Sequence, residues 1–260
     1  MPTERYSARM NEAIQTGNGR NQKLNSKALI GYVKEGMKYF PVYLDIRNKT
    51  AVIVGGGKVA ERKCRSLLDA GALVRVISPE IVKELERERD KGRIEHIARE
   101  YRCGDLDGAL LAFAATDRHE INQSVVAEAA KKAIPANCAD APESGTFISP
   151  AVVARGELLI TVSTGGNCPA LAGKIRAELA DRFGDEYAEA IQLLGAIREK
   201  LLTEKMNRQY NTSLLQLLVS HDLPKLLKNN CYDEIDHLLR KLFGPEFSLH
   251  ELGVGKRDPE

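Results

Sequence analysis

A glycine-rich turn is the first stretch of this sequence whose residue types could do chemistry. Residues 52–65 read VIVGGGKVAERKCR, an apolar run followed by three glycines and a segment with helical character. The turn matches the pattern G-x-G-x-x-A. In that pattern the first glycine makes a tight turn, the second admits a pyrophosphate, and the third small residue lets the helix pack closely on the strand. The helix amino terminus would then attract the phosphates. The turn predicts a dinucleotide site at Gly55, Gly56, Gly57, Lys58, Val59 and Ala60.

The acidic residue that usually binds the ribose of such a cofactor is missing. It would stand about 20 positions after the glycines, at the end of the second strand. Here that strand ends at Ile77 and is followed by Ser78 and Pro79, and the nearest carboxylate is Glu80. The Ser78 hydroxyl can hydrogen-bond a ribose, and no arginine follows to hold a 2′-phosphate. These residues favour NAD over NADP. A turn of this kind can also join a strand to a helix without binding a ligand, so the surrounding elements must decide.

The elements around the turn alternate as in an α/β protein. The continuous apolar run at 109–115 is typical of a central parallel strand that is covered on both faces. Residues 93–97 alternate as an edge strand would. This alternation predicts right-handed crossovers and a doubly wound, Rossmann-type parallel sheet. The other predicted strands are 51–54, 73–77 and 133–139, and the predicted helices are 58–70, a charged helix from Pro79, and 119–132.

After Pro142 the pattern changes to a hairpin followed by helices. TFISPAVVARGELLITVST contains two apolar strands, and in the second Leu158 and Ile160 face one side while Leu159 and Thr161 face the other. A two-stranded hairpin is not stable alone, so this one needs a partner from its own chain or from a second subunit. The sequence thus predicts a flexible extension over 1–36, a dinucleotide-binding domain over 37–145, a hairpin and loop over 146–170, and a helical domain over 171–260.

Composition and charge exclude several classes of protein. The 260 residues are 43% hydrophobic and 28% charged, as in an ordinary globular protein. No apolar run approaches the roughly 20 residues of a membrane span, and the N-terminus has no apolar core of a secretory signal. A cytoplasmic protein is therefore expected. The net charge of +2 gives no sign of a nucleic-acid or membrane-surface partner.

The cysteines predict neither disulfides nor a metal site. There are five, without a C-x-x-C pair and without a histidine at metal-ligand spacing. We expect reduced thiols at Cys64, Cys103, Cys138, Cys168 and Cys231.

Four separated motifs resemble the precorrin-2 dehydrogenase / sirohydrochlorin ferrochelatase family. That family's module also forms the N-terminal part of multifunctional siroheme synthases. The resemblance runs over residues 39–182, and because no methyltransferase module follows, the stand-alone form is expected. The motifs, in order, are AVIVGGGKVAERK, AFAATDRHEIN, ANCADAPESGTF and STGGNCPAL.

The resemblance implies NAD-dependent oxidation of precorrin-2 to sirohydrochlorin, and in some members insertion of Fe²⁺ to give siroheme. It also implies a homodimer whose hairpins, over 146–170, interlock between subunits. The essential aspartate of the family lies in the A-T-D motif, which is Asp117 here, with Thr116 beside it at the cofactor. A carboxylate just past an apolar strand stands where open α/β sheets place ligands, and it could act as a general base. Asp117 could equally cap the next helix, and the two roles are compatible.

Several further residues are expected at a substrate site, because precorrin-2 carries many carboxylates that need donors. Asp140 could line the cleft or serve the turn before Pro142, Thr146 stands where some members have a serine, and His119 is expected to be a solvated surface residue. Backbone N–H groups of the loop before residue 171 could bind an anion, whereas each basic candidate could equally be solvated. The substrate candidates are Asn137, Asp140, Thr146, Gly165, Gly166, Lys174 and Arg176, together with Arg155.

Two other functions stay open. A sirohydrochlorin ferrochelatase without dehydrogenase activity would insert metal without net oxidation, and the intact glycine turn counts against it. An NAD-sensing regulatory module would not need the A-T-D motif or the hairpin. It would bind NAD without reducing it, so turnover separates the two classes.

Overall fold

The computed structural model of the chain describes residues 38–203 and 208–254, and its contacts divide the chain into two units, 1–42 and 43–260. The extension predicted over 1–36 lies outside the described residues. All the helices and strands given below belong to the second unit. The finer division of that unit at residues 145 and 170 stays a prediction.

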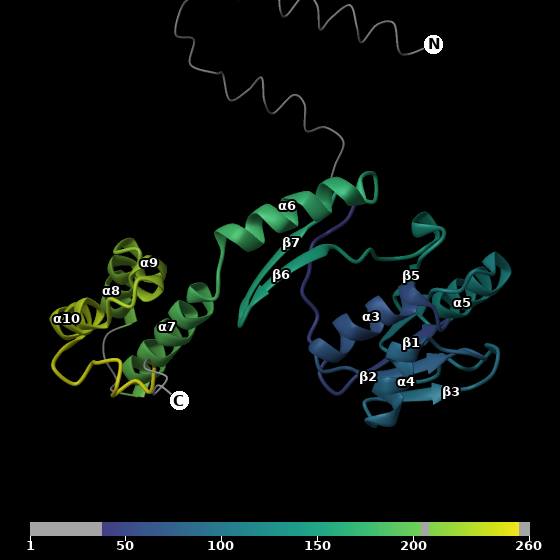
Figure 1. The fold of residues 1–260 in the computed structure, drawn as a ribbon, viewed down its shortest axis with the longest axis horizontal. Helices are drawn as coiled ribbons and strands as arrows, with labels where there is room; N and C mark the ends of the chain where they lie inside the picture. The colour runs from purple at the N-terminus through teal and green to yellow at the C-terminus, as the bar shows by residue number, and fades with distance from the viewer. Residues whose placement is uncertain (1–37, 204–207, 255–260) are drawn as a thin grey trace, which may run out of the picture. The chain divides into compact units, whose positions relative to one another are not determined.

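A five-stranded parallel sheet forms the first half of the second unit, with the strand order β3-β2-β1-β4-β5 (Figure 1). The chain winds one way from β1 to β3 and then crosses to β4 on the other side of β1. This reversal makes the carboxyl ends of β1 and β4 the switch point of the sheet, which is where such sheets bind ligands. The predicted Rossmann-type sheet is confirmed. Its strands are β1 (Thr50–Val54), β2 (Leu73–Ile77), β3 (Ile94–Ile97), β4 (Leu111–Ala114) and β5 (Ala136–Cys138).

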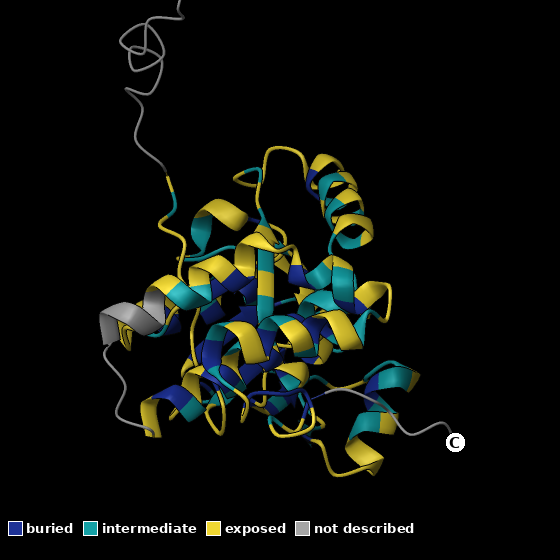
Figure 2. Cartoon of the chain, turned by 90° about the vertical axis from the view of Figure 1, so that its left-hand side faces the viewer, coloured by how far each residue is buried: buried dark blue, intermediate teal, exposed yellow. Residues whose placement is uncertain are grey.

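Helices cover both faces of this sheet because β1 is apolar on both. Ala51 and Ile53 pack with side chains of α3 (Lys58–Asp69) and α4 (Lys83–Asp90) in one buried cluster. Val52 and Val54 pack with α5 (His119–Lys131) in another. The buried residues accordingly lie along the inner faces of the elements in Figure 2.

The charged helix begins at Lys83, not at Pro79 as predicted. The backbone N–H of Val82 donates to the carbonyl of Gly56 at 2.9 Å, and Val82 is extended, with φ −68° and ψ 155°. Residues 79–82 therefore run beside the glycine turn before the helix starts. This contact joins segments 26 residues apart and leaves no local pattern in the sequence.

The predicted hairpin is present as β6 (Ala151–Arg155) and β7 (Leu158–Val162), paired antiparallel. Helix α6 (Pro169–Arg182) packs along both strands (Figure 1). Leu158 and Ile160 are half-buried, whereas Leu159 is 46% exposed, and on the neighbouring strand Val152 is 47% exposed. The chain thus covers one face of the hairpin and leaves the other face apolar and open.

The remaining helices pack around a second apolar core. Leu193, Ile197 and Leu201 of α7 are fully or nearly fully buried in it. The helices lie within the range 171–260 that was predicted to be helical, and α9 is the shortest of them, with six residues and a proline in its first turn. Of the described residues, no helix is long and apolar enough to cross a membrane. The helices are α7 (Glu186–Thr203), α8 (Arg208–Ser220), α9 (Leu223–Lys228) and α10 (Tyr232–Phe243), and a 3₁₀ turn (η1, Pro142–Ser144) precedes the hairpin.

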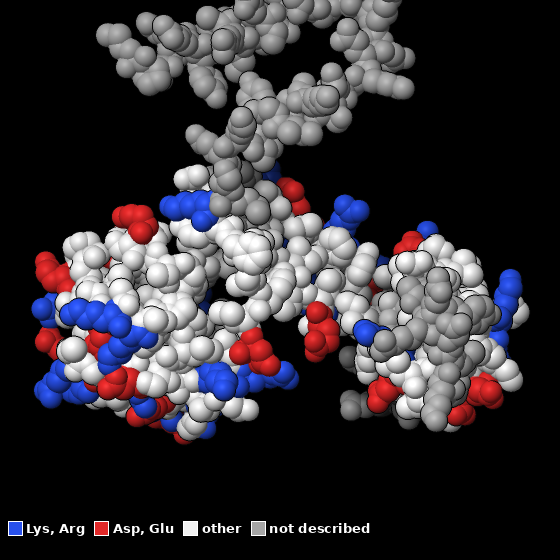
Figure 3. Space-filling model, turned by 180° about the vertical axis from the view of Figure 1, so that it is seen from behind, with Lys and Arg blue, Asp and Glu red and all other residues white. Residues whose placement is uncertain are grey.

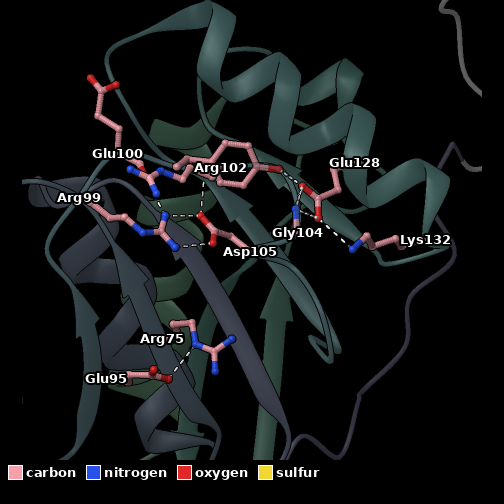
Figure 4. Close-up of polar contacts among 10 residues, drawn as sticks. Arg75, Glu95, Arg99, Glu100, Arg102, Gly104, Asp105, Glu128 and Lys132 are labelled. Carbon is pink, nitrogen blue, oxygen red and sulfur yellow. Dashed lines mark hydrogen bonds and ion pairs between the residues drawn. The ribbon is translucent and has the colours of Figure 1, made fainter.

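Charged side chains of both signs alternate over the surface. Figure 3 shows lysines and arginines interspersed with aspartates and glutamates on the sheet and its helices. Many form local pairs, such as Arg75 with Glu95 and Arg99 with Asp105, each 2.7 Å apart (Figure 4). On this face the charge is therefore mixed, in keeping with the net charge of +2.

A buried carboxylate fixes the long loop between β3 and β4 to α5 (Figure 4). The side chain of Glu128 is 5% exposed and accepts hydrogen bonds from the Tyr101 hydroxyl and, at 3.1 Å, from the backbone N–H of Gly104. Lys132, one turn on, is 3.1 Å away. Burial acts to raise the pKa of Glu128, but these hydrogen bonds outweigh it and hold the pKa below its usual value. The carboxylate is ionised and fully partnered.

Replacing Glu128 by glutamine should lower the free energy of unfolding by about 3 kcal/mol at pH 7, because the amide leaves buried donors without an acceptor. Urea unfolding measures the change. Because the folded-state pKa is lowered, the stabilisation is complete above the ordinary value of 4.5 and is lost as the pH falls. The difference between wild type and variant should therefore shrink in acid. Glu120→Gln, at an exposed position on the same helix, is the matched control and should change stability by less than about 0.5 kcal/mol. Equal stability of the Glu128 variant and wild type at pH 7 would contradict the assignment.

Candidate cofactor and catalytic site

Two of the three glycines are required by the protein itself. Gly55 follows β1 with φ +120°, and a Cβ there would overlap the backbone carbonyl of Ala115, just after β4. A Cβ at Gly56 would overlap the carbonyl of Glu80 and press on the Ser78 hydroxyl. The turn is thus packed against the loops that follow β4 and β2. This brings three loops together at the carboxyl edge of the sheet.

Gly57 differs, because the protein does not require a glycine there. Its backbone has φ −86° and ψ −169°, which any residue can adopt, and no described atom lies within 4 Å of the position of a Cβ. Gly57 is the N-cap of α3, and no side chain caps the helix. An open position at an uncapped helix amino terminus fits a pyrophosphate. The fold alone therefore does not explain the glycine at this place.

The rest of the turn serves packing and local ion pairs. Ala60 is fully buried between α3 and the sheet, as the third small residue should be. Lys58 is exposed and pairs with Glu84 at 3.0 Å and Glu61 at 3.3 Å, and hydrogen bonds to these two carboxylates raise its pKa. Val59 is 38% exposed on the same helical turn. Lys58 and Val59 lie at the predicted site without a contact that assigns them to a ligand.

Ser78, the predicted ribose ligand, lies against the turn through its hydroxyl. Its carbonyl oxygen is 2.9 Å from Nε2 of His96 on the neighbouring strand β3. His96 belongs to none of the motifs that predict the site from the sequence. Its signal is positional, because β3 runs parallel to β2 and His96 pairs with Val76, near the carboxyl end of that strand.

The loop that carries the A-T-D motif is held by a buried asparagine that sequence reasoning missed. Asn122 of α5 is fully buried and bonds to Thr116 three times. Its Oδ1 accepts from the backbone N–H of Thr116 at 3.1 Å and from the hydroxyl at 2.8 Å, and its Nδ2 donates to the Thr116 carbonyl at 3.0 Å. The Thr116 hydroxyl, predicted at the cofactor, is thus engaged within the loop.

Asp117 is exposed, and its carboxylate makes no hydrogen bond or ion pair with any described residue. It does not cap the next helix: the N-cap of α5 is Arg118, and no side chain caps it. The capping role considered from the sequence is therefore not seen. Asp117 follows, by two residues, the contact of Ala115 with Gly55.

His119 is exposed, as the sequence predicted, and it also has a partner. Its Nδ1 lies 2.8 Å from Oδ2 of Asp140, although the imidazole is 63% exposed. The other carboxylate oxygen of Asp140 accepts from Asn122 at 2.9 Å and from the thiol of Cys138 at 3.1 Å. The hydrogen bond from His119, with those from Cys138 and Asn122, lowers the pKa of Asp140 to about 2. Asp140 therefore stays ionised near neutral pH, which makes it a poor general base and leaves Asp117 as the free carboxylate.

Two other predicted residues are bonded to the backbone beside β5. Asn137 is 6% exposed, and its amide donates to the Phe147 carbonyl at 3.0 Å. The Thr146 hydroxyl accepts from the N–H of Ala136 at 2.9 Å. Both hold the segment before the hairpin against the sheet. Their predicted contact with a substrate stays a prediction.

The loop before α6 is turned by two glycines, Gly165 at φ +64° and Gly166 at φ +90°, both exposed. Of the basic candidates, Lys174 is 74% exposed, and its ion pair with Glu178 is long, at 3.9 Å. Arg176 is exposed and makes no ion pair with a described residue. Arg155 instead donates to the Ala180 carbonyl at 3.1 Å and ties the hairpin to α6, so its cation is largely used by the fold.

No metal centre is found among the described residues, since no three His, Cys, Asp or Glu side chains gather closely enough. All five cysteines are free. A hollow of about 210 Å³ lies between α3 and α4, lined by Cys64, Leu85, Glu61, Glu84 and Glu88 among others. Two of these carboxylates, Glu61 and Glu84, are the ion-pair partners of Lys58.

The fold and the glycine turn define a Rossmann-type domain for a nicotinamide dinucleotide. Residues 42–151 match a family model for NAD(P)-binding domains. The solved structure titled SirC, precorrin-2 dehydrogenase, superposes with a TM-score of 0.65 at 23% identity, over 78% of this chain and 98% of that one.

The closer sequence relatives are siroheme synthases. The protein of Methylobacillus flagellatus is 33% identical, and the match covers 86% of this chain and 49% of that protein. The protein of Chromobacterium violaceum is 40% identical, and the match covers 60% of this chain and 35% of that protein. This chain thus spans half or less of these relatives. The chain is a homologue of siroheme synthases, which confirms the resemblance predicted from its motifs.

Proposed function

We propose that this chain is a precorrin-2 dehydrogenase that oxidises precorrin-2 to sirohydrochlorin with NAD⁺. One observation carries the proposal: the turn at Gly55–Gly57 touches the loop at Ala115, and that loop presents a free carboxylate at Asp117. A cofactor site and a proton acceptor therefore meet at the switch point of the sheet. The names of the relatives, siroheme synthase and precorrin-2 dehydrogenase, support the same substrate.

The reaction removes two electrons and two hydrogens from the macrocycle. When bound, the nicotinamide takes one hydrogen with both electrons as hydride. The other leaves as a proton, and Asp117 is the residue that would accept it. The helix amino terminus at Gly57 would hold the pyrophosphate, and the Ser78 hydroxyl a ribose. Because no arginine follows Ser78, the proposed cofactor is NAD and not NADP.

The substrate carboxylates need donors outside the sheet. We place them at the backbone N–H groups around Gly165 and Gly166 and at Arg176, which has no described acidic partner. Lys174 is a second cation on the same helix. Asn137 and Thr146 hold the segment before the hairpin through backbone contacts, and Asp140 is held by the side chains of His119, Asn122 and Cys138.

The test is an anaerobic incubation of the purified chain with precorrin-2, with and without NAD⁺, followed by absorbance. Sirohydrochlorin that appears only with NAD⁺, together with an equal amount of NADH, is the expected result. Fe²⁺ is then added to the same cuvette, and the absorbance shows whether siroheme forms. Metal insertion into supplied sirohydrochlorin without any NAD⁺-dependent oxidation would replace the proposal by a chelatase. NAD⁺ binding with neither reaction would replace it by a sensor.

The proposed enzyme is a homodimer joined through the open face of the hairpin. Sedimentation of the wild type at micromolar concentration should give a dimer, because Val152 and Leu159 expose apolar surface there. Leu159→Glu should shift the equilibrium strongly toward monomer. Glu157→Gln, at the tip of the same hairpin, is the control and should leave the dimer intact. A monomeric wild type would contradict this part of the proposal.

A further inference from the structure

Asn122 is a polar side chain in the middle of an apolar helix face. Val125 and Ala129, three and seven positions on, are fully buried in the cluster between α5 and the sheet. Asn122 shares their stripe and is equally buried. A buried amide is costly unless it is hydrogen-bonded, so a leucine would suit packing better. The presence of asparagine calls for another explanation.

The hydrogen bonds of Asn122 supply it. An amide side chain can accept two bonds and donate two, and all four are made. Three go to Thr116, and the fourth runs from Nδ2 to Oδ1 of Asp140 at 2.9 Å. One side chain therefore joins the loop after β4 to the loop after β5.

Asp140 fixes the orientation of this amide. A carboxylate accepts only, so it sets Nδ2 toward Asp140 and the carbonyl oxygen toward the Thr116 N–H. His119 and Cys138 hold Asp140 in turn, at 2.8 and 3.1 Å. Asn122 thus holds the Thr116 backbone through both its N–H and its carbonyl, that is, through the peptide groups before and after Thr116. The carboxylate of Asp117, the next residue, makes no hydrogen bond or ion pair with a described residue that would fix it.

We propose that Asn122, oriented by Asp140, is a positioning residue that holds the 115–117 loop so that Asp117 points at the reacting centre. This inference rests on the proposed dehydrogenase function. It assigns Asn122 no contact with substrate or cofactor. A displacement of about 1 Å at a catalytic group can cost roughly 100-fold in rate, so the clamp has a measurable role.

Two substitutions test it. Asn122→Leu keeps the number and branching of the side-chain heavy atoms but removes every hydrogen bond, and it should lower kcat about 100-fold at every pH, with little change in the Kd for NAD⁺. Asn122→Asp keeps the acceptor for Thr116 but turns a second carboxylate toward Asp140. The like charge of Asp140 should raise the pKa of the new carboxyl, which should therefore stay protonated to a higher pH. Relative to wild type, the kcat of this variant should be lowest in alkaline buffer. It should recover as the pH falls, because the protonated carboxyl can again donate a hydrogen bond to Asp140.

Gln123 provides matched controls on the same helix. Its amide makes one long contact, 3.5 Å from the Ser144 hydroxyl. Gln123→Leu and Gln123→Glu should keep wild-type kcat and show no pH-dependent recovery. A role limited to stability would instead lower the melting temperature of the Asn122 variants and leave kcat of the folded fraction unchanged.

Amide hydrogen exchange gives a readout that does not need turnover. In Asn122→Leu, exchange at residues 115–118 should rise well above wild type, while β1 and β4 stay protected. Unchanged exchange there, or kcat within about threefold of wild type, would overturn the inference. A wild type that does not oxidise precorrin-2 would instead overturn the proposed function, and the exchange data would still decide whether Asn122 positions the loop.

Discussion

Replacing Asp117 by asparagine is expected to lower kcat for precorrin-2 oxidation by about 1,000-fold, within the range that a general base supplies. The amide has the same shape but cannot accept the proton at neutral pH. Because the Asp117 carboxylate is exposed and contacts no described residue, its loss should change the free energy of unfolding by less than about 0.5 kcal/mol. The affinity for NAD⁺ should stay near that of wild type.

Asp140 provides the contrast that makes this result specific. It lies two residues after the neighbouring strand β5, but it accepts hydrogen bonds from His119, Asn122 and Cys138. Asp140→Asn should therefore reduce stability as well as activity. With its pKa lowered to about 2, the Asp140 carboxylate stabilises the fold fully above its ordinary value of 3.8 and loses this contribution as the pH falls toward about 2.

Single-turnover absorbance at saturating NAD⁺ measures the chemical step for both variants, and thermal unfolding measures their stability. An Asp117→Asn enzyme with wild-type kcat would remove Asp117 from catalysis. Loss of stability in that variant, in place of turnover, would assign the residue to the fold.

The elements that could be predicted from the sequence are those encoded by neighbours in the chain. The glycine turn, the apolar run of β4 and the alternation in β7 each depend on residues a few positions apart, and all three are present. The late start of α4 was missed because Val82 bonds to Gly56. That contact depends on how β1 and β2 lie side by side.

The candidate site was predictable only in part, for the same reason. Asp117 could be found because it follows an apolar strand within a recognisable motif. The roles of Asn122 and His119 could not be assigned, since their partner Asp140 lies 18 and 21 residues away in the chain, in the loop after β5. One local signal was available: an asparagine standing in the apolar stripe of a helix, where burial needs a partner.

The substitution Gly57→Asp should weaken NAD⁺ binding by roughly 100- to 1,000-fold without disturbing the fold. The backbone at Gly57 suits any residue, and a Cβ there meets no described atom within 4 Å. The protein itself should therefore tolerate the aspartate. A bound pyrophosphate would not, because two like charges about 4 Å apart repel by roughly 4 kcal/mol at an effective dielectric constant near 20.

The matched control is Gly195→Asp, which makes the same change at an exposed, equally open position on α7. It should bind NAD⁺ as wild type does. Gly55→Ala should behave differently, because the φ of +120° and the Ala115 carbonyl leave no room for a side chain. That variant should lose stability, whatever its affinity for NAD⁺. Titration calorimetry with NAD⁺ separates the three. A Gly57→Asp protein that is folded and still binds NAD⁺ tightly would show that the cofactor does not lie on this turn. The open space at Gly57 would then need another explanation.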